Sequence, residues 1–244
     1  MSSTRGAGNE DMGEGRGPVR RILTRGRTLD HAAALYDIVQ PVVTLGRERR
    51  YQQRIVQELA LTPGCRVLDI GCGTGALTAS LGQCLDPGQG GQAVGIDAAP
   101  RMVEQAQRKR GCEATVFEIA AAEDLPFASG SFDAVCSAFF YHHVDFELKL
   151  EATREAWRVL RPGGAFLVLD LDVPTTWFGR LTIALAEAFL RQPEIGENAR
   201  GRMREAFLRG GFADMEALGH WQGYVSLFRM CKSVGRPPVV GVPK

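Results

Sequence analysis

The sequence predicts an α/β domain built on a doubly wound, mostly parallel sheet, and three observations carry this prediction. From Arg66 onward, short apolar runs alternate with segments of helical periodicity. Most of these runs are unbroken, as expected for strands that are covered on both faces. The first run ends in Asp69 and is followed by glycines at 71, 73 and 75, where a tight turn leads into a helix.

Length and composition exclude several other classes. The 244 residues are 45% hydrophobic and 23% charged, which is ordinary for a soluble globular protein. A net charge of +1 gives no reason to expect a nucleic-acid partner. There is neither a run long enough to span a bilayer nor a signal-peptide core. The six scattered cysteines form no C-x-x-C pair, so we expect reduced thiols, no metal site and a cytoplasmic location.

The residues before the alternating pattern divide into two parts. Residues 1–28 have almost no apolar periodicity, so we expect a flexible tail. Residues 29–61 predict a helical cap, with amphipathic segments over Leu29–Val43 and Leu45–Leu61. The second segment carries four arginines, Arg47, Arg49, Arg50 and Arg54. They form either a solvated helix face or a contact with an anionic membrane surface or substrate.

The main domain is expected over residues 62–235. Its first five strands are predicted at Val67–Ile70, Ala93–Asp97, Ala114–Ile119, Phe132–Ser137 and Ala165–Asp170. Helices are predicted at Gly75–Cys84, at Pro100–Arg110 and from about Asp145 to Leu160. We expect Arg161-Pro162-Gly163-Gly164 to end the last of these helices before the fifth strand begins.

Beyond the fifth strand, residues 171–210 predict a helical lid over the substrate. Its helices are expected at Trp177–Arg191 and Ala199–Arg209. Two more strands follow, at Met215–Ala217 and Tyr224–Cys231, and Cys231 is expected in the core with Cys136. Residues 236–244 form a Pro-rich tail.

Two carboxylates end neighbouring strands at the edge where open α/β sheets bind ligands. Asp97 either accepts two hydrogen bonds from a ribose diol or caps the helix that follows. Asp69 either caps the glycine turn or faces the positive end of a bound amino-acid moiety. Gly71 and Gly73 let such a ligand lie against the backbone. The spacing is Gly-x-Gly-x-Gly, which differs from the Gly-x-Gly-x-x-Gly of dinucleotide binders.

The loop after the fourth strand contains Tyr141, His142 and His143. Either histidine is a candidate general base, since imidazole titrates near neutral pH, or it packs against cofactor or core. We expect the two adjacent rings to point in different directions, so that at most one acts on the substrate. Tyr141 either orients the substrate or forms a wall. A two-histidine metal site is not expected, because no third ligand lies nearby in the sequence.

Several motifs resemble those of the class I S-adenosyl-L-methionine (SAM) methyltransferases. Arg66–Gly75 resembles their motif I, and Gly95–Met102 resembles motif II. Ala122-Glu123-x-Leu125-Pro126-Phe127 and Glu155–Gly164 resemble two later motifs, the last with a structural role in ending a helix. The resemblance covers about Leu29–Ser233 and is nearest to the ubiquinone/menaquinone C-methyltransferases. The Tyr36-Asp37 pair is also similar to the opening of the bacterial phospholipid N-methyltransferases.

The resemblance implies a Rossmann-like, seven-stranded sheet with a reversed C-terminal strand, and SAM as the cofactor. It implies that SAM is bound by Asp69, Gly71, Cys72, Gly73, Thr74, Asp97, Ala98, Met102, Ala121, Ala122, Glu123 and Ala138. Met102 would lie on the adenine face. Ala121 stands where the family usually carries an acidic or amide residue, which leaves the adenine edge to backbone groups or to Asp124.

The resemblance also implies an enzyme that methylates a small, lipophilic acceptor, quinone-, phenol- or lipid-like. The family's Phe-Gly-Leu-Arg-Asn-Val loop is replaced here by Phe139–Val144, close to the acceptor. A soluble natural product, a thiol and a metalloid such as arsenite are therefore alternative acceptors. A SAM-binding module without turnover is the alternative from another class.

Overall fold

The structure is a computed structural model that describes residues 24, 46–190 and 192–234. The expected helix at Leu29–Val43, the Tyr36-Asp37 pair, and both tails lie outside the described residues, apart from Thr24.

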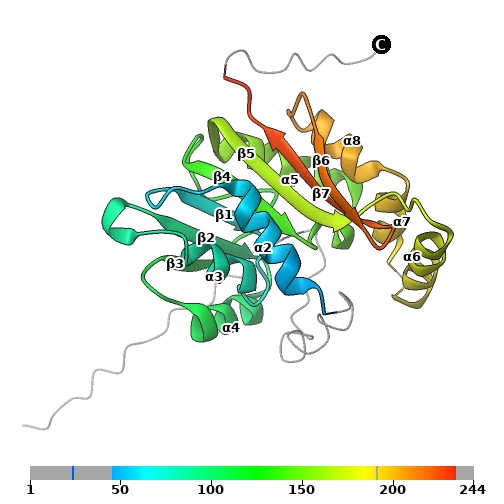
Figure 1. Cartoon of the computed structure of the whole chain (residues 1–244), viewed down its shortest axis with the longest axis horizontal. Coiled ribbons are helices and arrows are strands. Elements are labelled where there is room, and N and C mark those ends of the chain that lie inside the picture. Colours follow the sequence, from blue (N-terminus) through cyan, green and yellow to red (C-terminus); the bar gives the residue numbers. More distant parts are fainter. Residues whose placement is uncertain (1–23, 25–45, 191, 235–244) are drawn as a thin grey trace, which may run out of the picture.

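The described residues form a seven-stranded sheet in the order β3-β2-β1-β4-β5-β7-β6 (Figure 1). The strands are β1 (Arg66–Ile70), β2 (Gln92–Asp97), β3 (Thr115–Ile119), β4 (Phe132–Ala138), β5 (Leu160–Leu171), β6 (Glu216–Trp221) and β7 (Val225–Cys231). The pairings among β1 to β5 are parallel, and β7 runs antiparallel between β5 and β6. The predicted doubly wound sheet with one reversed strand is confirmed.

Helices cover both faces of this sheet (Figure 1). They are α2 (Glu48–Leu59), α3 (Ala76–Gly82), α4 (Pro100–Arg110), α5 (Phe146–Val159), α6 (Trp177–Leu190), α7 (Pro193–Ala199) and α8 (Arg202–Arg209). Two short 3-10 turns, η2 (Pro87–Gln89) and η3 (Tyr141–His143), lie between them. Asp145 caps α5 by accepting a hydrogen bond from the Leu148 N–H at 2.9 Å.

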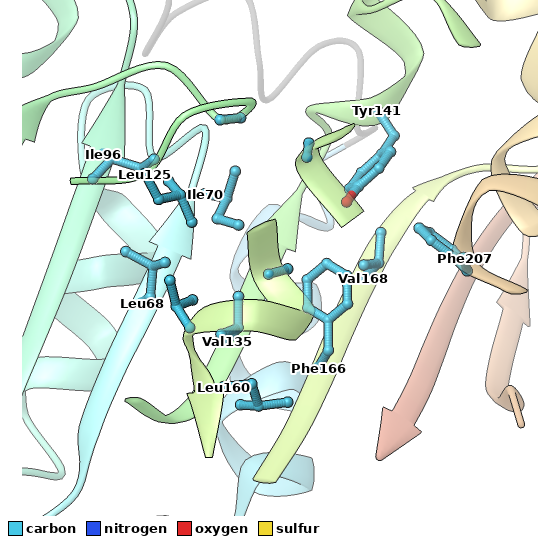
Figure 2. Packing of buried hydrophobic residues seen from close by; sticks show 14 of the residues in the cluster. Leu68, Ile70, Ile96, Leu125, Val135, Tyr141, Leu160, Phe166, Val168 and Phe207 are labelled. Carbon is cyan, nitrogen blue, oxygen red and sulfur yellow. The ribbon is translucent and has the colours of Figure 1, made fainter. Parts of the chain in front are cut away.

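Successive residues of the central strands pack against opposite layers, which explains why the strands are apolar throughout. On one face, Leu68, Val135 and Phe166 belong to a buried cluster that includes Phe207 of α8 (Figure 2). On the other face, residues such as Val67 and Leu167 pack with α2 and α3.

The Arg161–Gly164 segment differs from the expectation. The helix ends at Val159, and β5 already begins at Leu160, so the segment lies inside the strand rather than before it. Phe132 pairs with Leu160, whereas Ala134 pairs with Ala165, so the register shifts across these residues. Gly163, with φ of +80°, supplies the backbone conformation that this irregularity needs.

Two details near the C-terminus differ from the expectations. The helix predicted at Ala199–Arg209 is α8, which begins only at Arg202, after Gly201 at φ +81°, and α7 before it was not predicted. Cys231 is exposed at the end of β7 rather than buried in the core.

In the glycine turn before α3, close packing leaves no room for a side chain at Gly75. Gly75 has φ of +84°, and a Cβ there would lie 2.5 Å from Cε1 of Phe117. Gly90 has φ of +83° but no atom within 4 Å of the same position. Alanine at Gly90 therefore adds only backbone strain, about 1 kcal/mol, whereas alanine at Gly75 adds overpacking of about 1–3 kcal/mol more.

We therefore expect Gly75→Ala to lower the free energy of unfolding further than Gly90→Ala. Urea unfolding followed by circular dichroism measures both variants. Equal losses would show that the Phe117 contact does not restrict this turn.

Candidate active site

Two cavities lie at the carboxyl ends of β1, β2 and β4. They enclose about 660 Å³ and 450 Å³ when the solvent-filled space at their mouths is included, and both are partly open to solvent. Gly71 and Phe139 line both cavities, so the two are adjacent. We call them the first and second cavity.

The first cavity collects the residues predicted to bind a nucleoside. Its lining includes Gly71, Gly73, Asp97, Ala98, Met102, Ala122 and Glu123. The Asp97 carboxylate accepts hydrogen bonds from the Gly73 N–H at 3.0 Å and the Ala99 N–H at 2.8 Å. It therefore fastens the glycine turn and the start of α4 while forming part of the cavity wall.

The loop after β3 is clamped by the Glu155–Gly164 motif. Arg158 donates to the carbonyl oxygens of Phe127 at 2.6 Å and Leu125 at 2.9 Å, and Glu155 accepts from the Leu125 N–H at 2.8 Å. Besides ending a helix, this motif thus positions the loop that carries Ala122 and Glu123.

Not every residue of the loop after β3 reaches the first cavity. Ala121 is buried in a bridge with Asp124, and neither of these two residues lines a cavity. Thr24 does line the first cavity, and its hydroxyl donates to Oε1 of Glu123 at 2.8 Å.

The second cavity holds the other predicted residues. Asp69, Cys72, Thr74 and Ala138 line it, together with Glu48, Tyr51, Gln52 and Ile55 of α2. Asp69 is buried and accepts a hydrogen bond from the Thr78 hydroxyl at 2.7 Å. Burial raises the pKa of Asp69 to about 7, against the lowering effect of this hydrogen bond and with a further rise from the charge of Asp97. A cationic ligand beside Asp69 would favour its ionised form.

Tyr141 lies in the core rather than at either cavity. Its side chain is fully buried, its hydroxyl lies 3.2 Å from the Thr153 hydroxyl, and its ring packs against Phe207 (Figure 2). Burial raises the pKa of Tyr141 far above its usual value. This geometry supports a structural role for Tyr141 rather than a catalytic one.

The two histidines have different surroundings although their rings lie side by side. The ring centroids of His142 and His143 are 3.9 Å apart, so the expectation that the rings point in different directions is wrong. His143 lines the first cavity. Nδ1 of His142 lies 2.7 Å from Oδ1 of Asp170.

Asp170 is the site residue that sequence analysis missed. It is fully buried at the end of β5 and also accepts hydrogen bonds from the Tyr141 and Leu171 N–H groups, both at 2.7 Å. It thereby fixes Nδ1 of His142 and leaves Nε2 as the atom able to take up a proton. The position of Asp170 in the sequence could have revealed it. Like Asp69 and Asp97, it lies near the carboxyl end of a strand.

The segment expected as a lid supports the histidine turn from outside. No described residue of 171–210 lines either cavity, so its role as a lid stays a prediction. In α7, Glu197 pairs at 2.9 Å with the fully buried Lys149, which also donates to the Val144 carbonyl oxygen. Lys149 thus ties α5 and α7 to the residue that follows η3.

Among the described residues, no group of three or more His, Cys, Asp or Glu side chains is arranged to hold a metal ion. No helix in that part of the chain has the length and apolarity needed to cross a membrane.

Comparisons with known proteins agree with this geometry. Residues 68–168 match a family described as a methyltransferase domain. A demethylmenaquinone methyltransferase of Thermus thermophilus is 40% identical over 147 residues, which cover 58% of this chain and 63% of that protein. An uncharacterised methyltransferase of Synechocystis is 35% identical over 145 residues, covering 59% of this chain and 65% of that protein. The chain thus spans slightly less than two thirds of these relatives.

A solved structure shows the same fold. Phosphoethanolamine N-methyltransferase 2 of Haemonchus contortus, in complex with phosphomonomethylethanolamine and S-adenosylhomocysteine, superposes with a TM-score of 0.62 and 17% identity. The match covers 86% of this chain and 59% of that one.

Residues 68–168 thus match a methyltransferase domain, and the fold is similar to that of class I SAM-dependent methyltransferases. The sequence is close to the ubiquinone/menaquinone C-methyltransferase group, as the motifs indicated. SAM is the cofactor of this class, and the residues present fit it. Gly71 leaves no room for a Cβ, which would lie 2.8 Å from Phe140. Asp97 borders the first cavity and buried Asp69 the second, so that each cavity offers a carboxylate, one that would suit a nucleoside and one that would suit an ammonium group.

The raised pKa of Asp69 predicts that SAM binding depends on pH. Below about pH 7 the carboxyl group is mostly protonated, so binding the ammonium group of SAM must release a proton. Affinity should rise by up to about tenfold per pH unit below 7 and level off above it. Calorimetry from about pH 5.5 to 8.5, in two buffers of different ionisation enthalpy, measures both affinity and proton release.

Asp69→Asn should weaken binding and abolish this pH dependence. Asp97→Asn is the matched control at the first cavity. It should weaken SAM binding but leave the pH dependence of binding unchanged. If the wild-type protein binds SAM without releasing a proton, Asp69 does not face the ammonium group.

Proposed function

We propose that this chain transfers a methyl group from SAM to a small, lipophilic acceptor that carries an oxygen atom, such as a quinol or phenol. SAM supplies an electrophilic methyl group and a neutral thioether leaving group. The protein must align acceptor, methyl carbon and sulfur, and must exclude water. The two adjoining cavities suit this task, with the acceptor held in the part of the second cavity beneath α2.

One observation carries the choice of acceptor: a buried hydroxyl group without a partner in a largely apolar wall. Tyr51 is only 4% exposed, and its hydroxyl has no hydrogen-bond partner among the described residues. The tyrosine ring lies against Phe139 and Trp221, with centroids 6.0 and 5.5 Å apart. Leaving a buried hydroxyl unpaired costs about 1–3 kcal/mol. An acceptor oxygen that meets this hydroxyl would remove the cost, while Ile55 and Leu169 contact its apolar part.

The second element is a base for an acceptor that must lose a proton. His142 lies beside Phe139, with ring centroids 6.3 Å apart, and Phe139 lines both cavities. Asp170 holds Nδ1 of His142, so Nε2 takes up the proton from the acceptor carbon or oxygen. The resulting imidazolium is stabilised by the carboxylate of Asp170.

The test is methyl transfer itself. Purified protein is incubated with methyl-labelled SAM and, separately, with a demethylated quinol, a simple phenol, a thiol, arsenite and a bacterial lipid extract. We expect label in the quinol or phenol, or in the lipophilic fraction of the extract. Transfer mainly to the thiol or arsenite would contradict the proposal. SAM binding without transfer to any acceptor would support a binding module instead.

Tyr51→Phe provides the matched variant, because it removes only the hydroxyl. It should raise the KM of the acceptor and leave SAM affinity unchanged. An unchanged KM would show that this hydroxyl does not contact the acceptor.

Replacing the histidines separates their roles. His142→Ala should lower kcat by about two to four orders of magnitude, the usual effect of removing a positioned base, with SAM affinity nearly unchanged. Asp170→Asn should lower kcat less and shift the pH profile, because Nδ1 loses its charged partner. His143→Ala, the adjacent control, should chiefly change SAM affinity or stability. Near-normal turnover in both histidine variants would place the base elsewhere, or would indicate an acceptor that arrives already deprotonated, such as a thiolate.

A further inference from the structure

Helix α6 exposes a stripe of large apolar side chains. Seven such residues are exposed in the described part of the chain, and five of them lie on this helix. They are Trp177 (74% exposed), Phe178, Leu181, Leu185 and Phe189 (88% exposed). Their spacing places them along one side of the helix, while Ile183, on another side, is buried in the core. A contiguous stripe of this kind is typical of an interaction surface.

Basic side chains lie close to this stripe. Arg180 is exposed on α6 itself, and Arg47, Arg49 and Arg50 are exposed at the start of α2. In Figure 1 the start of α2 lies at the lower side of the molecule and helix α6 at its right-hand side.

The turn between β6 and β7 lies close to the start of each helix. The Thr175 N–H donates to the Gly223 carbonyl oxygen at 2.9 Å, and Gly179 of α6 packs closely on the same oxygen. The next residue is Tyr224, whose pKa is raised by burial while the nearby positive charge of Arg47 opposes the rise. Arg47 and the first turn of α6 thus both lie near this short turn.

Aromatic residues beside arginines match the surface of an anionic bilayer. Trp and Phe side chains insert at the boundary between headgroups and acyl chains, and arginines contact the lipid phosphates. Stable attachment needs two such signals, and this face carries both. A second copy docked symmetrically on the same face would bring its arginines near those of the first, which disfavours a dimer there.

We propose that α6 and the basic start of α2 form one surface that docks on an anionic lipid bilayer. The inference goes beyond the proposed function and does not rest on it. Such docking would also orient the site. The second cavity is lined by Glu48, Tyr51 and Gln52, which lie next to these arginines in α2. Docking would bring the mouth of that cavity close to the lipid.

Vesicle sedimentation of the full chain, without SAM or acceptor, tests the surface. Vesicles of phosphatidylcholine with phosphatidylglycerol should bind the protein, and vesicles of phosphatidylcholine alone should bind it much less. Added salt should weaken binding. Leu185→Glu with Phe189→Glu, and separately Arg49→Glu with Arg50→Glu, should each lower the partition coefficient at least about tenfold.

Matched controls lie away from this face. Leu208→Glu changes an apolar side chain of α8 that is 50% exposed, and Arg108→Glu with Arg154→Glu reverses two exposed charges on α4 and α5. Both should bind anionic vesicles like the wild type. The emission of Trp177 should shift to the blue on binding, and Trp177→Phe should remove that shift.

Three outcomes would overturn the proposal. The first is absence of binding to anionic vesicles, or binding that the α6 and arginine variants do not weaken. The second is a lipid-free dimer in sedimentation equilibrium that Leu185→Glu dissociates, which would assign the face to a second copy. The third is a Trp177 that acrylamide cannot quench in the lipid-free monomer, which would assign the face to residues 25–45 of the same chain.

Discussion

The turn between β1 and α3 is held against the end of β2, and the geometry of the site depends on this attachment. The N–H groups of Gly71 and Cys72 both donate to the Ile96 carbonyl oxygen at 2.9 Å, and the Gly73 N–H donates to Asp97. The chain approaches so closely that a Cβ at Gly71 would overlap Phe140. Phe139 takes up the left-handed backbone conformation, with φ of +58°, and its side chain reaches both cavities. Gly71 of this restrained turn and the Phe139 side chain thus line both cavities.

Three aspartates at strand ends have different roles because their surroundings differ. Asp97 is partly exposed and accepts backbone N–H bonds. Asp170 is fully buried but holds an imidazole and two N–H groups. Asp69 is buried with less support, and its pKa rises to about 7. Above that pH the ligand-free protein carries a buried charge that opposes folding, because the unfolded carboxyl ionises at much lower pH. An ammonium group bound beside Asp69 would offset this cost and would couple ligand binding to stability at this residue.

The sequence predicted the parts of this structure that follow from local patterns. Unbroken apolar runs marked the five parallel strands, and the acidic residues and glycines at their ends marked the cofactor site. What it missed depends on tertiary contacts. Asp170 meets His142 only because β5 pairs with β4 in one particular register. Tyr141 enters the core because η3 turns its ring toward Phe207, which no periodicity in a short loop reveals. The sheet register likewise places Arg161–Gly164 inside β5, although its glycines are typical of a helix end.

The family resemblance says more about the cofactor than about the acceptor, because the matched domain covers only part of the proposed site. The matched methyltransferase domain covers residues 68–168, which includes the glycine turn, Asp97 and the clamped loop after β3. It stops two residues before Asp170. The groups that we assign to acceptor binding and docking lie outside it, on α2, α6 and the end of β5. The histidine turn lies inside it but takes its orientation from Asp170 and its support from α7. The match therefore covers the elements that we assign to the cofactor, whereas most of the residues that we assign to the acceptor, such as Tyr51 and Asp170, lie outside it.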